Sequence, residues 1–259
     1  MRHAATAIAI ALLASAPAHA QWIHLPLPGT PRSADGAPDL AAPAPKTSDG
    51  HVDLSGIWRT TGEVAESFEG QDLPNLAKVA DIPIRPDAER QYREAQAARL
   101  KEMSSLQCFP HGVPGSMLVR NLPFKIVQAP GVVLMLFEEF VDYRQIFTDG
   151  RDLPKDPNPT WYGYSVGAWQ PDSLVVRSVG FNDRTWLDLS GHGHSEALRT
   201  TEVFRRPRFG HMDVDVTFDD SKTFTKPWSA TLPFELVPDT ELLEYICENE
   251  RDARHSVGH

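Results

Sequence analysis

Residues 210–218 read GHMDVDVTF, and this stretch decides the fold that the sequence predicts. Apolar side chains occupy every second position, at Met212, Val214, Val216 and Phe218, with polar side chains between them. Successive side chains of a β-strand point to opposite faces, so such a strand has one buried face and one face in water. The stretch therefore predicts an antiparallel sheet that covers a core.

Strand patterns recur on both sides of this stretch. They begin at Asp53 and continue at residues 124–128, 132–140, 142–148, 162–169, 174–181, 197–205 and 229–237, with turn-forming residues between them. Short strands spaced about 8–12 residues apart are typical of antiparallel barrels and sandwiches. Because the strands follow one another as hairpins, we expect an all-β, antiparallel up-and-down barrel, with a β-sandwich as the alternative.

Other segments frame this β domain. Residues 86–104 (PDAERQYREAQAARLKEMS) predict one surface helix, since Pro and Asp suit its first turn and strong helix formers fill it. Residues 21–52 are rich in Pro and Ala and lack apolar periodicity, which predicts an extended leader. We expect a single barrel domain over residues 53–250 and a C-terminal tail over residues 251–259.

The first 20 residues predict export. A basic start at Arg2, a short apolar run and the small-residue site Ala18-His19-Ala20 are typical of a cleaved signal peptide. No other apolar run approaches the ~20 residues of a membrane helix, so no membrane insertion is expected. The protein is expected in the periplasm or outside the cell, where its two cysteines, Cys108 and Cys247, would form a disulfide.

The charge of the chain excludes one class of partner. Its formal net charge is −10 at pH 7, and no basic stripe with interleaved aromatic residues is present. Nucleic-acid phosphates select basic surfaces, so no nucleic-acid partner is expected.

Polar residues that can carry chemistry gather between two of the predicted hairpins, from Asn182 to Glu196 (NDRTWLDLSGHGHSE). A histidine beside a carboxylate titrates near neutrality and can transfer protons. Four residues of this stretch are therefore candidates for acid–base catalysis: His194, Asp183, Glu196 and Asp188.

The same stretch contains a candidate metal site. His192, His194 and Glu196 are spaced i, i+2, i+4, which places three side chains on one face of an extended strand. Two imidazoles and a carboxylate could bind a divalent transition metal. The flanking glycines, Gly191 and Gly193, favour a loop instead, in which the histidines are hydrogen-bonded or solvated. No other cofactor is predicted.

Several residues are candidates for ligand contacts. Trp186, Trp161, Tyr164 and Asn182 lie in or near the polar stretch and are expected to line a barrel mouth. Arg144 either pairs with a barrel carboxylate such as Glu138 or Glu202, or clamps an anionic ligand.

Two resemblances add to this interpretation. Gly56-x-Trp58 at the head of the first strand resembles the opening signature of calycin (lipocalin-like) barrels, in which the Trp closes one barrel end. The blocks GFNDRTWLD, HSEALRTTEVFRR and TKPW resemble a widespread, uncharacterised family of exported bacterial proteins. The second resemblance implies a secreted β domain and no particular activity.

Three functions follow from these patterns. The first is the binding of a small apolar or aromatic molecule at a mouth lined by residues 182–196. The second is an enzyme on the same scaffold, a lyase, isomerase or hydrolase that uses His194 with Asp183 or Glu196, with or without a metal. The third is an envelope module that binds another protein, whose identity the sequence does not indicate.

Overall fold

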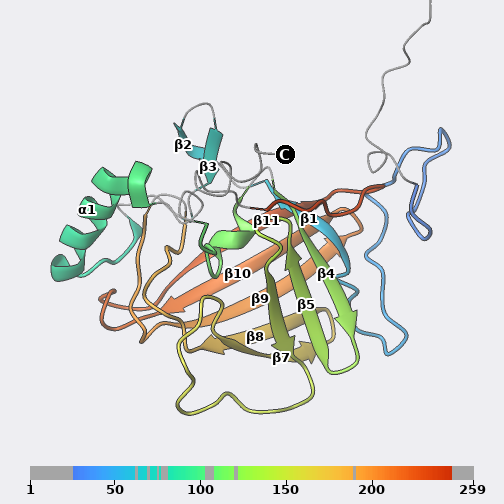
Figure 1. Cartoon of the computed structure of the whole chain (residues 1–259). Coiled ribbons are helices and arrows are strands. Elements are labelled where there is room, and N and C mark those ends of the chain that lie inside the picture. Colours follow the sequence, from blue (N-terminus) through green and yellow to red (C-terminus); the bar gives the residue numbers. More distant parts are fainter. Residues whose placement is uncertain are drawn as a thin grey trace, which may run out of the picture.

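The protein folds into a closed β-barrel (Figure 1). The computed structural model describes residues 26–61, 64–68, 71–74, 76, 81–102, 108–119, 122–188 and 191–246. Around the barrel the strand order is β1, β11, β10, β9, β8, β7, β6, β5, β4. The strands are β1 (Gly56–Thr60), β4 (Phe124–Ala129), β5 (Val132–Phe137), β6 (Tyr143–Phe147), β7 (Tyr164–Gln170), β8 (Ser173–Val179), β9 (Arg199–Arg208), β10 (His211–Asp219) and β11 (Trp228–Leu236). The predicted barrel is confirmed, and the sandwich alternative is wrong.

Three further elements lie outside the ring of strands. A hairpin of β2 (Val64–Phe68) and β3 (Gln71–Pro74) forms a separate two-stranded sheet. The helix α1 (Pro86–Glu102) confirms the predicted surface helix, and a 3₁₀ turn, η3, covers Gly115–Met117. Among the described residues, no helix has the length and apolar character needed to cross a membrane.

One pair of neighbouring strands is parallel. A closed ring in which every neighbour is antiparallel needs an even number of strands, and this barrel has nine. The ring can close with nine strands because one neighbouring pair is parallel. This pair is β6 and β7, joined through Ile146↔Ser165 and Phe147↔Val166. Parallel neighbours require a crossover connection rather than a hairpin. Residues 148–163 supply it, and they contain Pro154, Pro157 and Pro159.

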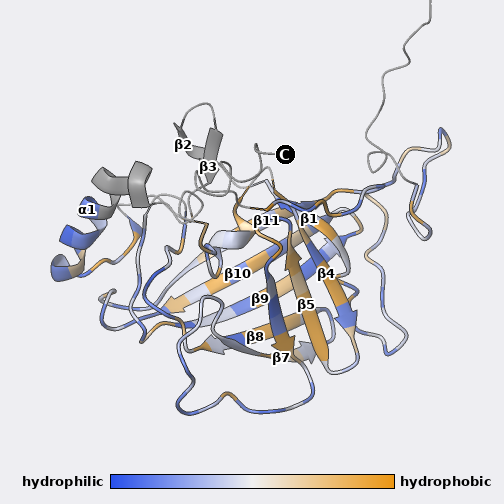
Figure 2. Ribbon diagram, viewed as in Figure 1, coloured by the Kyte–Doolittle hydropathy of each residue, from blue (hydrophilic) through white to orange (hydrophobic). Residues whose placement is uncertain are grey.

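Alternating side chains fill the inside of the barrel. Met212, Val214, Val216 and Phe218 of β10 are all fully buried, which confirms the pattern that predicted the fold. Figure 2 shows apolar and polar residues mixed along β10 and an almost wholly apolar β5. The facing side chains of the other strands join one core cluster, including Phe124, Met135, Ile146, Val176, Phe204 and Phe234. The interior is therefore a packed core.

A buried ion pair crosses this apolar interior. Arg144 of β6 is bidentate to Glu202 of β9, with 3.0 Å between Nη1 and Oε1, and both side chains are almost fully buried. The guanidinium also donates to the hydroxyls of Ser165 and Ser178, which bond to each other at 2.9 Å. Of the two interpretations of Arg144, the structural ion pair is confirmed, and Glu202 is its partner.

Trp58 closes the end of the barrel where β1 begins. Its ring is fully buried and its Nε1 donates to the Leu54 carbonyl at 2.9 Å. The Arg206 guanidinium lies 4.9 Å from the ring centroid and donates to the carbonyls of Asp53, Ser55 and Phe209. Burial lowers the pKa of Arg206 to about 10, against the opposing effect of Asp53.

The structure also explains why a glycine occupies the first position of the Gly-x-Trp motif. Gly56 has φ +142°, and a Cβ added there would lie 2.5 Å from Leu236 Cδ1 of the adjoining strand. Only glycine fits this conformation and this close approach.

The leader packs on the same closed end. Phe209 N donates to the Ala42 carbonyl and Gly210 N to the Leu40 carbonyl, both at 2.8 Å. Arg32 forms a bidentate ion pair with Asp239 at 2.6 and 2.9 Å. From residue 26 onward the predicted extended leader is thus docked on the barrel, at the end opposite α1 (Figure 1). The signal peptide, Cys247 and the tail from residue 251 lie outside the described residues.

The two ends of the barrel differ in their connections. The strands that meet at the closed end are joined by short turns at residues 130–131, 171–172 and 209–210. At the other end, which we call the mouth, residues 180–198 connect β8 to β9 and residues 220–227 connect β10 to β11. Binding sites concentrate on long connections held by a rigid scaffold, so the mouth is where a site is expected.

Candidate functional site

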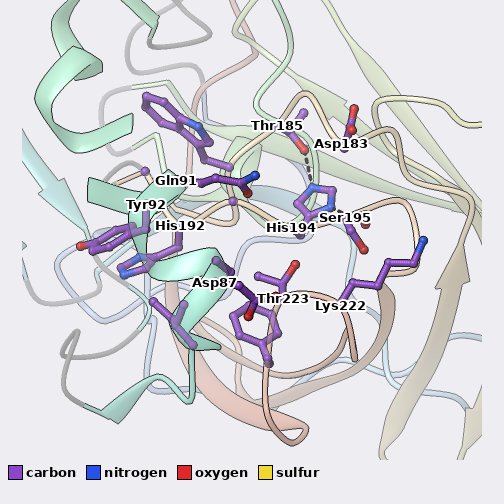
Figure 3. A pocket seen from close by; sticks show the side chains of 16 residues that line it. Asp87, Gln91, Tyr92, Asp183, Thr185, His192, His194, Ser195, Lys222 and Thr223 are labelled. Carbon is purple, nitrogen blue, oxygen red and sulfur yellow. Dashed lines mark hydrogen bonds between the residues drawn. The ribbon is translucent and has the colours of Figure 1, made fainter. Parts of the chain in front are cut away.

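A cavity of about 550 Å³ lies at the mouth (Figure 3). We call it the mouth pocket. It is lined by Ile84 and the first turns of α1, by Asp183, Thr185, Trp186 and residues 191–195, and by the residues 222–224 of the turn after β10. Three segments far apart in the sequence therefore build it, and only the middle one was predicted.

The middle segment is a loop that doubles back on itself. Leu187 N donates to the His192 carbonyl at 2.7 Å, Trp186 and Gly193 form an isolated β-bridge, and Gly191 has φ +97°. Leu187 is fully buried and anchors the loop in the core. Of the two interpretations of residues 192–196, the loop favoured by Gly191 and Gly193 is confirmed, and no strand forms there.

The segment that packs under this loop, residues 111–117, was not predicted to take part in a site. A Cβ added to Gly112 would lie 2.9 Å from Thr185 Oγ1, and one added to Gly115 would lie 3.1 Å from the Trp186 carbonyl. The segment from His111 to Met117 therefore packs directly against the loop and supports it.

His192 is held by a buried carboxylate. Its Nδ1 donates to Asp188 Oδ2 at 2.6 Å, and its backbone N donates to Asp188 Oδ1 at 3.3 Å. The imidazole stacks on Tyr92 of α1, with ring centroids 4.4 Å apart and planes inclined by 8°. Both residues of the Asp188–His192 pair are about 99 % buried, and His192 Nε2 has no hydrogen-bond partner in the described part of the structure.

His194 is hydrogen-bonded through both ring nitrogens. Nδ1 lies 3.1 Å from the Ser195 carbonyl, which can only accept, so Nδ1 carries the proton. Nε2 lies 2.8 Å from Thr185 Oγ1. Burial lowers the pKa of His194, although the Ser195 carbonyl, Asp220 and Asp183 partly oppose it. The imidazole is therefore neutral near pH 7, and Nε2 accepts a hydrogen bond from the Thr185 hydroxyl.

Asp220 fixes the end of the loop to the turn after β10. It accepts from Ser195 N at 2.7 Å, from the Ser195 hydroxyl at 2.8 Å and from Lys222 N at 3.0 Å. Burial alone would raise the pKa of Asp220, but these hydrogen bonds and one from the Thr223 side chain lower it. Its oxygens are thus occupied within the protein.

The predicted site residues separate into two groups. Those that line the mouth pocket are Asp183, Trp186, His192 and His194, and Asp188 holds one of them. The others lie elsewhere: Trp161 stacks on Phe109, Tyr164 accepts from Arg151, Asn182 caps the backbone of Arg184, and Arg144 is in the core. Tyr92 and Thr185 were not predicted, since neither the helix pattern nor a lone Thr indicates a pocket.

The three predicted metal ligands are not brought together. Glu196 lies at a separate surface depression beside Lys155 and Arg199. His192 and His194 each use Nδ1 on a protein acceptor. Within the ranges that the structure describes, no group of three or more His, Cys, Asp or Glu side chains is arranged to hold a metal ion.

The fold and the site define a nine-stranded barrel whose mouth carries a pocket built around two buried histidines. Comparisons of the chain with protein-family models, with curated proteins and with solved structures find no match.

Proposed function

We propose that the protein binds a small molecule in the mouth pocket. The observation that carries this proposal is a cavity of about 550 Å³ that contains buried, oriented polar groups. Ligand sites of about 300–1,000 Å³ with a few fixed polar groups are typical of small-molecule binding. Because core side chains fill the barrel, the ligand would lie in the mouth rather than along the barrel axis.

The lining indicates a ligand of mixed polarity. Ile84, Tyr92, Trp186 and Phe224 offer apolar surface, whereas the histidines, Thr185 and the rim carboxylates offer polar contacts. An aromatic or aliphatic body with a polar end fits this lining better than the wholly apolar molecule that the sequence also allowed.

Trp186 provides the test of this proposal. Replacing Trp186 with alanine is expected to weaken ligand binding at least about tenfold, because the apolar contact of a large aromatic side chain is lost. Trp161→Ala is the matched control, since Trp161 lies outside the pocket and packs on Phe109. The measurement is ligand-observed NMR with a library of small aromatic and heteroaromatic molecules. Equal losses in both variants, or no hits for the wild type, would contradict the proposal.

Acid–base catalysis in the same pocket is the second candidate function. The pair formed by Thr185 Oγ1 and the neutral His194 Nε2, 2.8 Å apart, favours it, because a neutral imidazole can accept a proton from a hydroxyl. His194→Gln would then abolish turnover of a bound molecule and leave its binding largely intact. Loss of both together would favour simple binding.

We also propose export, with removal of residues 1–20 and a disulfide between Cys108 and Cys247. His111, near Cys108, lies 3.3 Å from Glu139, and Tyr245, near Cys247, pairs with the same Glu139. His111 and Tyr245, each close in sequence to one cysteine, therefore meet at Glu139, which supports the proposed disulfide. Protein recovered from the periplasm or medium is expected to begin at Gln21 and to react with a thiol reagent only after reduction. Intact mass before and after reduction decides both points.

A further inference from the structure

We infer that the mouth pocket recognises its ligand through hydrogen-bond donors on the ligand, a hydroxyl or an amino group, and that it discriminates against anions. This inference rests on the proposed binding function and adds the chemical class of the ligand. It follows from the fixed orientation of the two buried imidazoles, each of which has a proton on Nδ1 held by an oxygen of the protein.

The first acceptor is the Thr185 hydroxyl. Its proton is used by His194 Nε2, because His194 Nδ1 already donates to the Ser195 carbonyl. A hydroxyl has one proton and two acceptor lone pairs. What Thr185 Oγ1 can still offer to a ligand is therefore an acceptor, and Thr185 lines the pocket next to His194 (Figure 3).

The second acceptor is His192 Nε2. Asp188 accepts the Nδ1 proton of this imidazole, so in the neutral form of the ring Nε2 carries a lone pair. That nitrogen is buried and has no partner among the described residues, and the residue belongs to the pocket wall. A buried acceptor without a hydrogen bond is unfavourable, because it has given up its hydration for no partner. A ligand donor that reached it would recover part of this cost.

The remaining charges of the pocket agree with this class of ligand. Asp183 and Asp87 place carboxylates on the exposed rim, and Lys222 is the cation among the described lining residues. Asp220 is occupied by Ser195 and Lys222 backbone donors and contributes no free acceptor. A carboxylate ligand has only acceptors. Thr185 and His192 also offer acceptors to the pocket, so they supply no donor for a carboxylate.

Four small probes of similar size test the inference: phenethyl alcohol, phenethylamine, methyl phenethyl ether and phenylacetate. Each is titrated into ¹⁵N-labelled protein, and binding is measured from the shifts of pocket amides. We expect the alcohol or the amine to bind about tenfold more tightly than the ether and phenylacetate, the value of one or two hydrogen bonds. Tighter binding of the alcohol than of the amine assigns hydroxyl donors, and the reverse order assigns amino donors.

Two variants alter the two acceptors and keep the hydrogen bond that each imidazole makes through Nδ1. Asn reproduces the Nδ1–H donor of His but not Nε2, so His192→Asn keeps a donor for Asp188, and His194→Asn keeps one for Ser195 while freeing the Thr185 proton. At least one of them is expected to reduce the preference for the alcohol over the ether to less than about threefold. His211→Asn, on the outer face of β10, is the matched control and should preserve the preference.

The outcomes separate the two proposals. Equal binding of alcohol, amine, ether and phenylacetate in the pocket overturns the donor rule and leaves small-molecule binding standing. A preference that survives both His192→Asn and His194→Asn also overturns it. If no probe shifts the pocket amides and Trp186→Ala changes nothing in the library screen, both the proposed function and this inference are wrong.

Discussion

Replacing Glu202 with leucine is expected to lower the free energy of unfolding by about 3–5 kcal/mol. The substitution leaves the Arg144 guanidinium inside the barrel with only Ser165, Ser178 and the Met135 sulfur as neighbours to bond. A buried charge that loses its counter-ion cannot regain the hydration that it gave up on folding. Urea unfolding monitored by tryptophan fluorescence measures the effect.

Two further variants define what the Glu202 result means. Exchanging both partners, Arg144→Met with Glu202→Leu, is expected to restore most of the stability, because no buried charge remains. Asp215→Asn breaks the ion pair with Arg205 on the partly exposed outer face and is expected to cost about 0–1 kcal/mol. If Glu202→Leu lowers the free energy of unfolding no more than Asp215→Asn does, water reaches the Arg144–Glu202 pair.

Truncating Trp58 to alanine is expected to cost about 3–5 kcal/mol, the usual range for a fully buried Trp or Phe. The cavity left behind would adjoin Arg206. The Arg206 guanidinium would lose its contact with the Trp58 ring but would still donate hydrogen bonds to three carbonyls. Thermal and urea unfolding measure the loss.

Trp169→Ala is the matched control for Trp58→Ala. Trp169 is only partly buried and stacks on His51 at 5.1 Å, so its removal leaves a smaller cavity. We expect the control to lose clearly less stability than Trp58→Ala. Equal losses would mean that Trp58 does not close the barrel end as described.

Much of the barrel could be predicted from the sequence, because the strand pattern is local. The alternation at residues 212–218 and the hairpin turns each depend on neighbouring residues, and so does the helix from Pro86. The parallel pairing of β6 and β7 could not be predicted in this way. It is a property of the closed ring and depends on the number of strands.

The leader shows a second limit of local patterns. Its composition predicted an extended chain, but residues 26–52 fold back on themselves in turns, with antiparallel bridges between Arg32 and Pro38 and between Lys46 and Val52. The segment is held by the backbone donors of Phe209 and Gly210. Those partners lie far away in the sequence, and Pro- and Ala-rich residues carry no signal of them.

The site was predicted in part for the same reason. Trp186 and His194 could be named because polar and aromatic residues are dense between Asn182 and Glu196. Tyr92 and Thr223 reach the pocket only through the fold. The i, i+2, i+4 spacing of His192, His194 and Glu196 gives a shared face only in a strand, and these residues lie in a loop.

Closure of the ring by its first and last strands has a consequence for how the protein forms. β1 pairs with β4 on one side and with β11 on the other. Trp58 of β1 is opposite Leu236 of β11, which lies far away along the chain. Pairings between distant residues slow folding, because a long loop must close before contacts compensate for its entropy. Until β11 is in place, the barrel has two open edges that can pair with another molecule. A chain shortened before Trp228 is thus expected to aggregate rather than to fold into a smaller barrel.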